Sequence, residues 1–185
     1  GGNDYLEANH GDDILIGGLG EDTLKGGTGN DIYEWSVGDG NDKIIENGGV
    51  DQLHLKGVTQ DDVRLETAGY DLEVYIGSEY ITLDNFLKSD VSQSSAYDYE
   101  MVDEIIFDDG SSINLMGDLT FNGTDARDTI KGTNGADTLE GGLGNDNVYG
   151  GHGDDTYIWH LGDGEDKFSD STGIDTLRIH GIHHT

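Results

Sequence analysis

Along two stretches of the chain, an apolar side chain recurs every nine residues, two positions after an aspartate. The aspartates are Asp4, Asp13, Asp22, Asp31, Asp128, Asp137, Asp146 and Asp155, and their apolar partners are Leu6, Leu15, Leu24, Tyr33, Ile130, Leu139, Val148 and Tyr157. After a step of eleven residues in each stretch, the register continues at Asp42, Asp51, Asp166 and Asp175. Fixed periods of this kind are typical of stacked repeats, in which each repeat buries its apolar face against its neighbours.

The two stretches are themselves copies of a longer unit. Ten residues between Asp31 and Leu53 recur 124 positions later, between Asp155 and Leu177. We therefore expect a repeat block over residues 1–58, a different segment over 59–119 and a second, truncated repeat block over 120–185. Because the chain opens inside one repeat and stops inside another, we interpret it as a piece of a longer array.

The fullest repeats read Gly-Gly-x-Gly-x-Asp-x-apolar-x, which we number as positions 1 to 9; they cover residues 17–25, 26–34, 141–149 and 150–158. The glycines permit a tight turn with positive φ and close approach of main chains. The last three positions suit a short strand with one inward side chain. Two repeats then complete one coil, so the pattern predicts two parallel sheets stacked with apolar residues between them.

The predicted turns are suited to a hard cation. A bent main chain can aim several carbonyl oxygens inward, and the aspartate at position 6 adds a carboxylate, which together make the ligand set that calcium prefers. Zinc would require His or Cys ligands, and the chain has no cysteine. An ion between turns on successive coils would be shared by both, so we expect several calcium ions.

The charge balance agrees with a cation as partner. The chain has 39 acidic and 9 basic residues and a net charge of −30, which argues against nucleic acid or an anionic membrane as a direct partner. No apolar run is long enough to insert into a bilayer. With few large apolar residues, such a chain folds only if its carboxylates are neutralised.

The repeats resemble the nonapeptides of the RTX (repeats-in-toxin) family. The resemblance rests on residues 17–25, 26–34, 141–149 and 150–158, and it implies an all-β fold with two right-handed parallel β-roll blocks separated by a β-rich capping segment. It also implies calcium-dependent folding outside the cell and export through type I secretion machinery by Gram-negative bacteria.

Carried over by position, the resemblance implies calcium ligands of two kinds. The carboxylate ligands would be Asp4, Asp13, Asp22, Asp31, Asp42, Asp128, Asp137, Asp146, Asp155 and Asp166. The glycines of the turns that carry main-chain ligands would be Gly11, Gly17, Gly18, Gly20, Gly26, Gly27, Gly29, Gly135, Gly141, Gly142, Gly144, Gly150, Gly151 and Gly153. Some turns depart from the pattern: Thr124 and Thr133 stand at position 2, and the turns at Asp51 and Asp175 lack most glycines. Sites there are in doubt, and a capping role is the alternative for Asp51 and Asp175.

The segment over residues 59–119 lacks the glycine register. Alternating apolar and polar residues at 63–66, 72–76 and 80–83 predict an antiparallel meander, and residues 105–107 and 113–115 predict a further strand, turn and strand. The polar stretch 89–99 predicts a loop. An exposed parallel edge needs cover, so we expect this segment to cap the first roll.

Other chemistries fit the sequence less well. No Ser, His and acid set has a signature spacing, so we expect no enzymatic activity. Tyr33, Trp35 and Val37, with their copies Tyr157, Trp159 and Leu161, would share a face, and we expect them to pack in the core or the cap rather than form a sugar platform. His180, His183 and His184 form a local cluster, for which a frayed terminus is preferred over zinc.

The sequence therefore predicts a calcium-binding structural module, secreted or at the bacterial cell surface. Two alternatives stay open: a calcium-dependent ligand-binding module of an adhesin, with a host-cell or surface ligand, and the carboxyl-terminal export and folding domain of a secreted protease or lipase.

Overall fold

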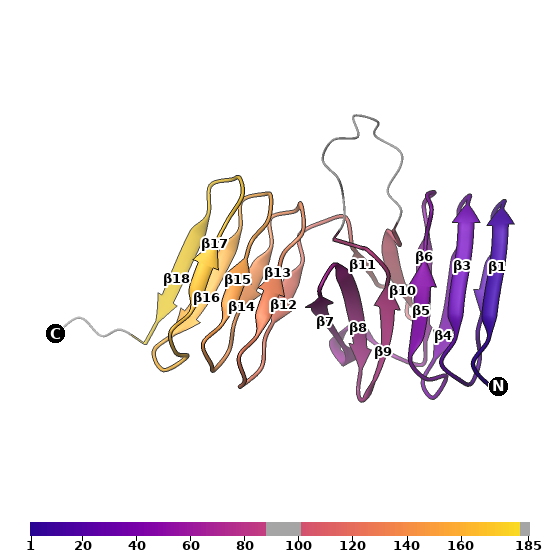
Figure 1. The fold of residues 1–185 in the computed structure, drawn as a ribbon, viewed down its shortest axis with the longest axis horizontal. Helices are drawn as coiled ribbons and strands as arrows, with labels where there is room; N and C mark the ends of the chain where they lie inside the picture. Colours follow the sequence, from indigo (N-terminus) through magenta and orange to yellow (C-terminus); the bar gives the residue numbers. More distant parts are fainter. Residues whose placement is uncertain (88–100, 182–185) are drawn as a thin grey trace. The chain divides into compact units, whose positions relative to one another are not determined.

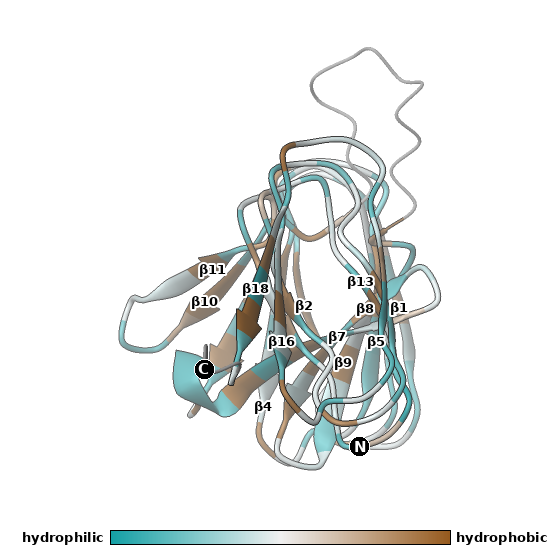
Figure 2. Cartoon of the chain, turned by 90° about the vertical axis from the view of Figure 1, so that its left-hand side faces the viewer, coloured by the Kyte–Doolittle hydropathy of each residue, from teal (hydrophilic) through white to brown (hydrophobic). Residues whose placement is uncertain are grey.

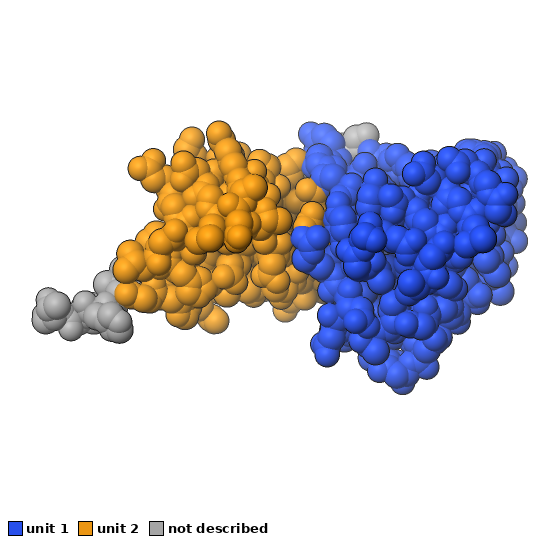
Figure 3. Space-filling view, turned by 90° about the horizontal axis from the view of Figure 1, so that it is seen from below, with its two compact units in different colours: residues 1–64, 68–115 blue, residues 65–67, 116–185 orange. Residues whose placement is uncertain are grey.

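A computed structural model describes residues 1–87 and 101–181 of the chain (Figure 1). They form two compact units, coloured separately in Figure 3: unit 1 comprises Gly1–Arg64 and Ala68–Leu115, and unit 2 comprises Leu65–Thr67 and Met116–Thr185. The predicted loop at residues 89–99 lies outside the described residues, as do His183 and His184. The three-segment division at residues 58 and 119 stays a prediction.

Unit 1 is built on two sheets of mostly short strands. The six-stranded sheet has the order β1 (Tyr5–His10), β3 (Thr23–Thr28), β5 (Asp42–Ile45), β9 (Glu79–Leu83), β8 (Asp71–Ile76) and β7 (Val63–Ala68). The five-stranded sheet has the order β11 (Ser112–Asn114), β10 (Glu104–Phe107), β6 (Gln52–Lys56), β4 (Ile32–Ser36) and β2 (Ile14–Ile16). A short 3₁₀ helix, η1 (Gln60–Asp62), precedes β7.

Successive coils of the first block stack in the predicted parallel register. Leu6 pairs with Leu24, 18 residues later, whereas Tyr33 pairs with Leu53, 20 residues later, because the eleven-residue step lengthens that coil. The apolar residues at position 8 point inward, and from the second repeat on they are buried: Leu15, Leu24, Tyr33, Ile44 and Leu53. The prediction of two nonapeptides per coil is confirmed.

The middle segment continues both sheets of the first block. β9 pairs parallel with β5, and β10 pairs parallel with β6. The predicted antiparallel pairs are also present, as β8 with β9 and β10 with β11. Its strands therefore cover the last coil by main-chain pairing, and Phe86, just after β9, is buried.

Unit 2 repeats the parallel arrangement. Its four-stranded sheet has the order β12 (Thr120–Asn122), β14 (Thr138–Glu140), β16 (Thr156–His160) and β18 (Thr176–His180), and its three-stranded sheet has the order β13 (Thr129–Lys131), β15 (Asn147–Tyr149) and β17 (Lys167–Ser169). All neighbouring strands in these sheets are parallel. Figure 2 shows hydrophobic colour on strands such as β16 and β18, and mostly hydrophilic or neutral colour on the turns.

Two residues that the sequence placed on the inward face are not part of the core. Trp35 is buried, but Val37 and Leu161 are 62% and 68% exposed. Both follow the ends of their strands, at Ser36 and His160, where the inward alternation stops. The prediction that they share the inward face of the preceding tyrosine is therefore wrong.

Candidate metal centre

The aspartates at position 6 form a ladder from coil to coil. In each step, the main-chain N–H of one aspartate donates to Oδ1 of the aspartate on the following coil, as Asp13 does to Asp31 at 2.9 Å. The same bond joins Asp4 to Asp22, Asp22 to Asp42, Asp31 to Asp51, Asp128 to Asp146, Asp137 to Asp155, Asp146 to Asp166, and Asp155 to Asp175. One oxygen of each acceptor carboxylate is therefore committed to holding the coils together.

The second oxygen of many of these carboxylates is buried and has no hydrogen-bond partner. This holds for Oδ2 of Asp13, Asp22, Asp31, Asp51, Asp146 and Asp155. A buried carboxylate oxygen without a partner is costly, and because it only accepts, a bound cation is one ligand that would satisfy it. Such oxygens, present in six of the turns, fit calcium ions held between coils.

The position-1 glycines provide the room around these oxygens. A Cβ atom on Gly17, Gly26, Gly141 or Gly150 would come closer than 3.0 Å to Oδ2 of the aspartate five residues later. Any other residue there would fill the space in which a ligand to that oxygen must lie. This explains why the sequence keeps glycine at a place that positive φ does not require.

The position-4 glycines bring main-chain oxygens close. Gly29 has a φ of +127°, and a Cβ there would collide with the carbonyl oxygen of Gly11, 18 residues earlier. Gly20, Gly144 and Gly153 lie in the same way against the carbonyl oxygens of Gly2, Ala126 and Gly135. Positive φ is shared by Gly11, Gly18, Gly20, Gly27, Gly29, Gly142, Gly144, Gly151 and Gly153, but not by Gly17, Gly26, Gly135, Gly141 and Gly150.

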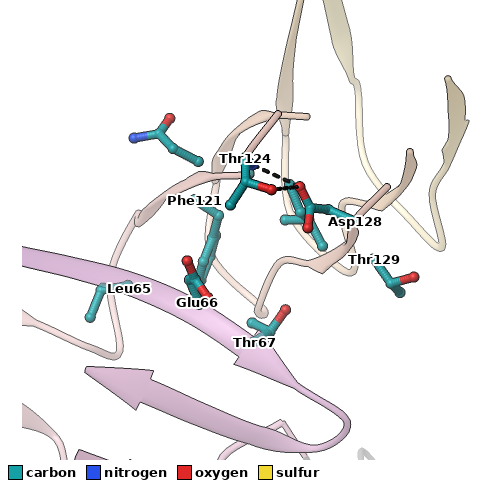
Figure 4. Close-up of a pocket in the computed structure, with 10 residues that line it drawn as sticks. Leu65, Glu66, Thr67, Phe121, Thr124, Asp128 and Thr129 are labelled. Carbon is teal, nitrogen blue, oxygen red and sulfur yellow. Dashed lines mark hydrogen bonds between the residues drawn. The ribbon is translucent and has the colours of Figure 1, made fainter. Parts of the chain in front are cut away.

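Two turns of unit 2 close without a cation. Thr124 donates to Oδ2 of Asp128 from its main-chain N–H at 2.7 Å and from its hydroxyl at 2.9 Å (Figure 4). Thr133 makes the same two bonds to Oδ2 of Asp137. The carboxylates of these two turns are therefore satisfied by the protein itself. Calcium ligation by Asp128 and Asp137 stays a prediction.

Two acidic triads stand at matching places in the two blocks. Asp31, Glu46 and Asp51 each offer one oxygen within 4.8 Å of the others, and so do Asp155, Asp170 and Asp175. All three residues of the first triad are buried, whereas only Asp155 is buried in the second. Asp51 therefore lies beside Asp31, and Asp175 beside Asp155, as expected of further aspartates at position 6. A capping role was the alternative for Asp51 and Asp175.

The sequence analysis missed Glu46 and Asp170 because both replace a position-1 glycine. A signal was nevertheless present, since the two acids are 124 positions apart and therefore occupy the same place in the longer unit. It also missed a second ladder at position 5, in which Asn30, for example, donates its N–H to Asp12 Oδ1 at 2.8 Å and accepts from the N–H of Val50. Asparagine or aspartate at position 5 therefore ties coils together.

Burial disfavours the charged form of these carboxylates. It raises the pKa of Asp42, Asp51 and Asp155 to about 6 and that of Glu46 to about 7. Nearby carboxylates raise them further, and the hydrogen bonds of the ladder act in the opposite direction. A bound cation would remove this penalty, because an opposite charge favours the ionised form.

Oxygen ligands without sulfur or imidazole, arranged between parallel coils, define a calcium-binding β-roll. The family model of the RTX calcium-binding nonapeptide repeat matches four copies, over residues 1–33 and 122–157. Residues 1–33 and 122–157 therefore carry RTX calcium-binding nonapeptide repeats, as the sequence predicted. Comparison with curated proteins gives no match.

Proposed function

We propose that the chain is a structural module of a protein secreted by type I machinery, and that it folds when calcium fills its turns outside the cell. The observation that carries the proposal is the row of buried Oδ2 atoms without partners, of which those of Asp31, Asp51 and Asp155 belong to the best enclosed residues. The matched RTX repeats support calcium as the ion.

In this proposal the carboxylate oxygens and the glycines of the turns have separate roles. Oδ1 of each ladder aspartate clamps the preceding coil, Oδ2 is left for the ion, and the glycines at positions 1 and 4 make room and bring carbonyl oxygens close. Calcium supplies the positive charge. Without calcium, the repulsion between the carboxylates exceeds the stabilisation that the hydrogen bonds of the ladder provide. Metal binding and folding are therefore one event.

The module has no catalytic role in this proposal. The carboxylates that the fold gathers are assigned to the ion and to the ladders, which leaves none of them free for proton transfer.

Among residues 1–87 and 101–181, no helix is long and apolar enough to cross a membrane. Low cytosolic calcium would keep the chain extended for export, and millimolar calcium outside would fold it.

Calorimetric titration of the metal-stripped chain tests the proposal. We expect calcium to bind at several sites with heat that includes folding, and magnesium and zinc to give neither the stoichiometry nor the folding. Absence of calcium uptake would refute the proposal, and an equal response to magnesium would refute the assignment of the ion.

A further inference from the structure

The last coil of the first block has an acidic residue at position 1, where the fullest repeats of the block have Gly17 and Gly26. There Glu46, directly after β5, replaces the glycine, and it is only 5% exposed. It lies beyond residue 33, where the matched repeat ends, so the RTX consensus gives it no role.

Three oxygens from two successive coils converge beside Gly26. A Cβ on Gly26 would come closer than 3.0 Å to Asp31 Oδ2, to the Tyr33 hydroxyl and to Glu46 Oε1. Asp51 adds a third carboxylate, with one oxygen within 4.8 Å of those of Asp31 and Glu46. The absent side chain of Gly26 thus leaves the space that these groups face.

Two of the carboxylates in this space are unsatisfied. Asp31 and Asp51 are 0% exposed, and Oδ2 of each has no hydrogen-bond partner. Two buried acceptors without donors, next to a third buried carboxylate, point to a positively charged ligand independently of the clustering of acids.

Tyr33 holds the glutamate in place. Its hydroxyl donates to Glu46 Oε1 and accepts from the main-chain N–H of Gly26 at 2.8 Å, while Glu46 Oε2 accepts from the N–H of Asn47 at 3.1 Å. The orientation of the Glu46 carboxylate is therefore fixed before any ion arrives, which lowers the cost of binding.

We propose that Asp31, Glu46 and Asp51 form a three-carboxylate calcium site that closes the first roll and binds calcium more tightly than the glycine turns do. Ligand charge count sets calcium affinity in oxygen sites, and here a side-chain carboxylate is added where the consensus has none. Tyr33 is the positioning residue of this site.

The site also connects the roll to the strands that cap it. The N–H of Asp51 donates to Asp103 Oδ2 at 2.7 Å, and the N–H of Asp103 donates to the carbonyl oxygen of Asp51 at 2.9 Å. Asp103 directly precedes β10, which pairs with β6. Filling the site should therefore stabilise the pairing of the last coil with β10 of the capping segment.

The second block offers a natural contrast. Its equivalent residues Asp155, Asp170 and Asp175 also converge, but Asp170 and Asp175 are exposed, and Tyr157 is 3.4 Å from Asp170 Oδ1. A looser and wetter copy of the same site should bind calcium more weakly.

The inference rests on the proposed function, and Glu46→Gln tests it by calorimetric calcium titration of the whole chain at pH 8. We expect loss of one tight ion, or at least about a tenfold lower affinity for it, with the remaining sites retained. The matched control is Glu73→Gln, which alters another glutamate bonded to a tyrosine hydroxyl, that of Tyr75, outside the turns. It should leave the titration unchanged.

Each outcome separates the two proposals. Wild-type chain that takes up no calcium refutes the proposed function, whereas normal uptake with an unchanged titration of Glu46→Gln overturns only the three-carboxylate site. If Glu46→Gln fails to fold even in millimolar calcium, terbium decides instead. The first terbium equivalent should luminesce on excitation through tyrosine, and Tyr33→Phe should abolish that signal; full emission from Tyr33→Phe overturns the inference.

Discussion

The turn at Gly26–Asp31 in unit 1 and the turn at Thr133–Asp137 in unit 2 use the same aspartate in different ways. Asp31 Oδ2 is buried without a partner, whereas Asp137 Oδ2 accepts from both the N–H and the hydroxyl of Thr133. In our proposal the first turn takes up an ion at this oxygen, whereas the second supplies its own donors. One residue at position 2 thus separates a turn whose carboxylate oxygen is left unpaired from one whose carboxylate oxygen is hydrogen-bonded.

This difference predicts that the first coil of unit 2 depends less on calcium than the other coils do. The first coil of unit 2 contains both threonine turns, at Asp128 and Asp137, while the turns that follow at Asp146 and Asp155 again have unpaired Oδ2 atoms. We expect that coil to need less calcium than its neighbours, because its carboxylates are already hydrogen-bonded.

The largest effect should come from filling the space beside an unpaired oxygen. Gly26→Ala places a methyl group against Asp31 Oδ2, so the free energy of unfolding in saturating calcium should fall by about 2–4 kcal/mol. Denaturant unfolding measures this. Gly57→Ala is the control, since a Cβ there meets open space, although its φ of +74° adds a backbone cost. Equal calcium affinity in Gly26→Ala and wild type would contradict the role of Gly26.

The second test exchanges the carboxylate for an amide in both turns. Asp31→Asn should raise the calcium concentration at half-folding by about tenfold, because a charged ligand is lost. Asp137→Asn should cost about 1–2 kcal/mol at every calcium concentration, because it weakens only hydrogen bonds. Calcium titrations followed by circular dichroism separate the two, and identical behaviour of the variants would remove the distinction between the turns.

The third test converts one kind of turn into the other. Thr133→Gly restores the consensus at position 2 and removes the hydroxyl donor to Asp137. We expect the lost hydrogen bond to cost about 1 kcal/mol of folding free energy, and calorimetry to show the gain of one bound ion. An unchanged ion count would mean that the hydroxyl is not what keeps calcium from this turn.

The smallest predicted effect is a dependence on pH. Burial raises the pKa of Asp51 and Asp155 to about 6, so without a cation the coiled conformation is disfavoured further as pH rises through 6. Protons and calcium then compete for the same oxygens. Calcium affinity should rise several-fold from pH 6 to pH 8, because a group with a pKa of about 6 is half protonated at pH 6. A titration independent of pH would contradict this competition.

The sequence was sufficient for the roll because its periods are geometric. An aspartate followed two positions later by an inward residue, at a spacing of nine, specifies one turn and one strand, and the observed 18-residue pairing of Leu6 with Leu24 follows directly. The alternation over residues 72–83 was likewise enough to predict the β8–β9 hairpin.

The sequence was not sufficient where a residue acts through a distant partner. That β9 and β10 continue the two sheets depends on main-chain pairing, which leaves no mark in side-chain periodicity. The role of Glu46 depends on its contacts with Tyr33 and Gly26 from the preceding coil. Position 1 of the repeat pattern, taken alone, indicates only that a glycine has been replaced.

The most direct measurement compares amide NMR spectra of the chain with calcium and after complete removal of metal at neutral pH. We predict well-dispersed signals for the glycine turns around Asp22, Asp31 and Asp155 only in the calcium sample, with collapse to narrow, unfolded-like positions when the ion is chelated. Signals from these turns that stay dispersed without metal would contradict the claim that their buried oxygens require a cation.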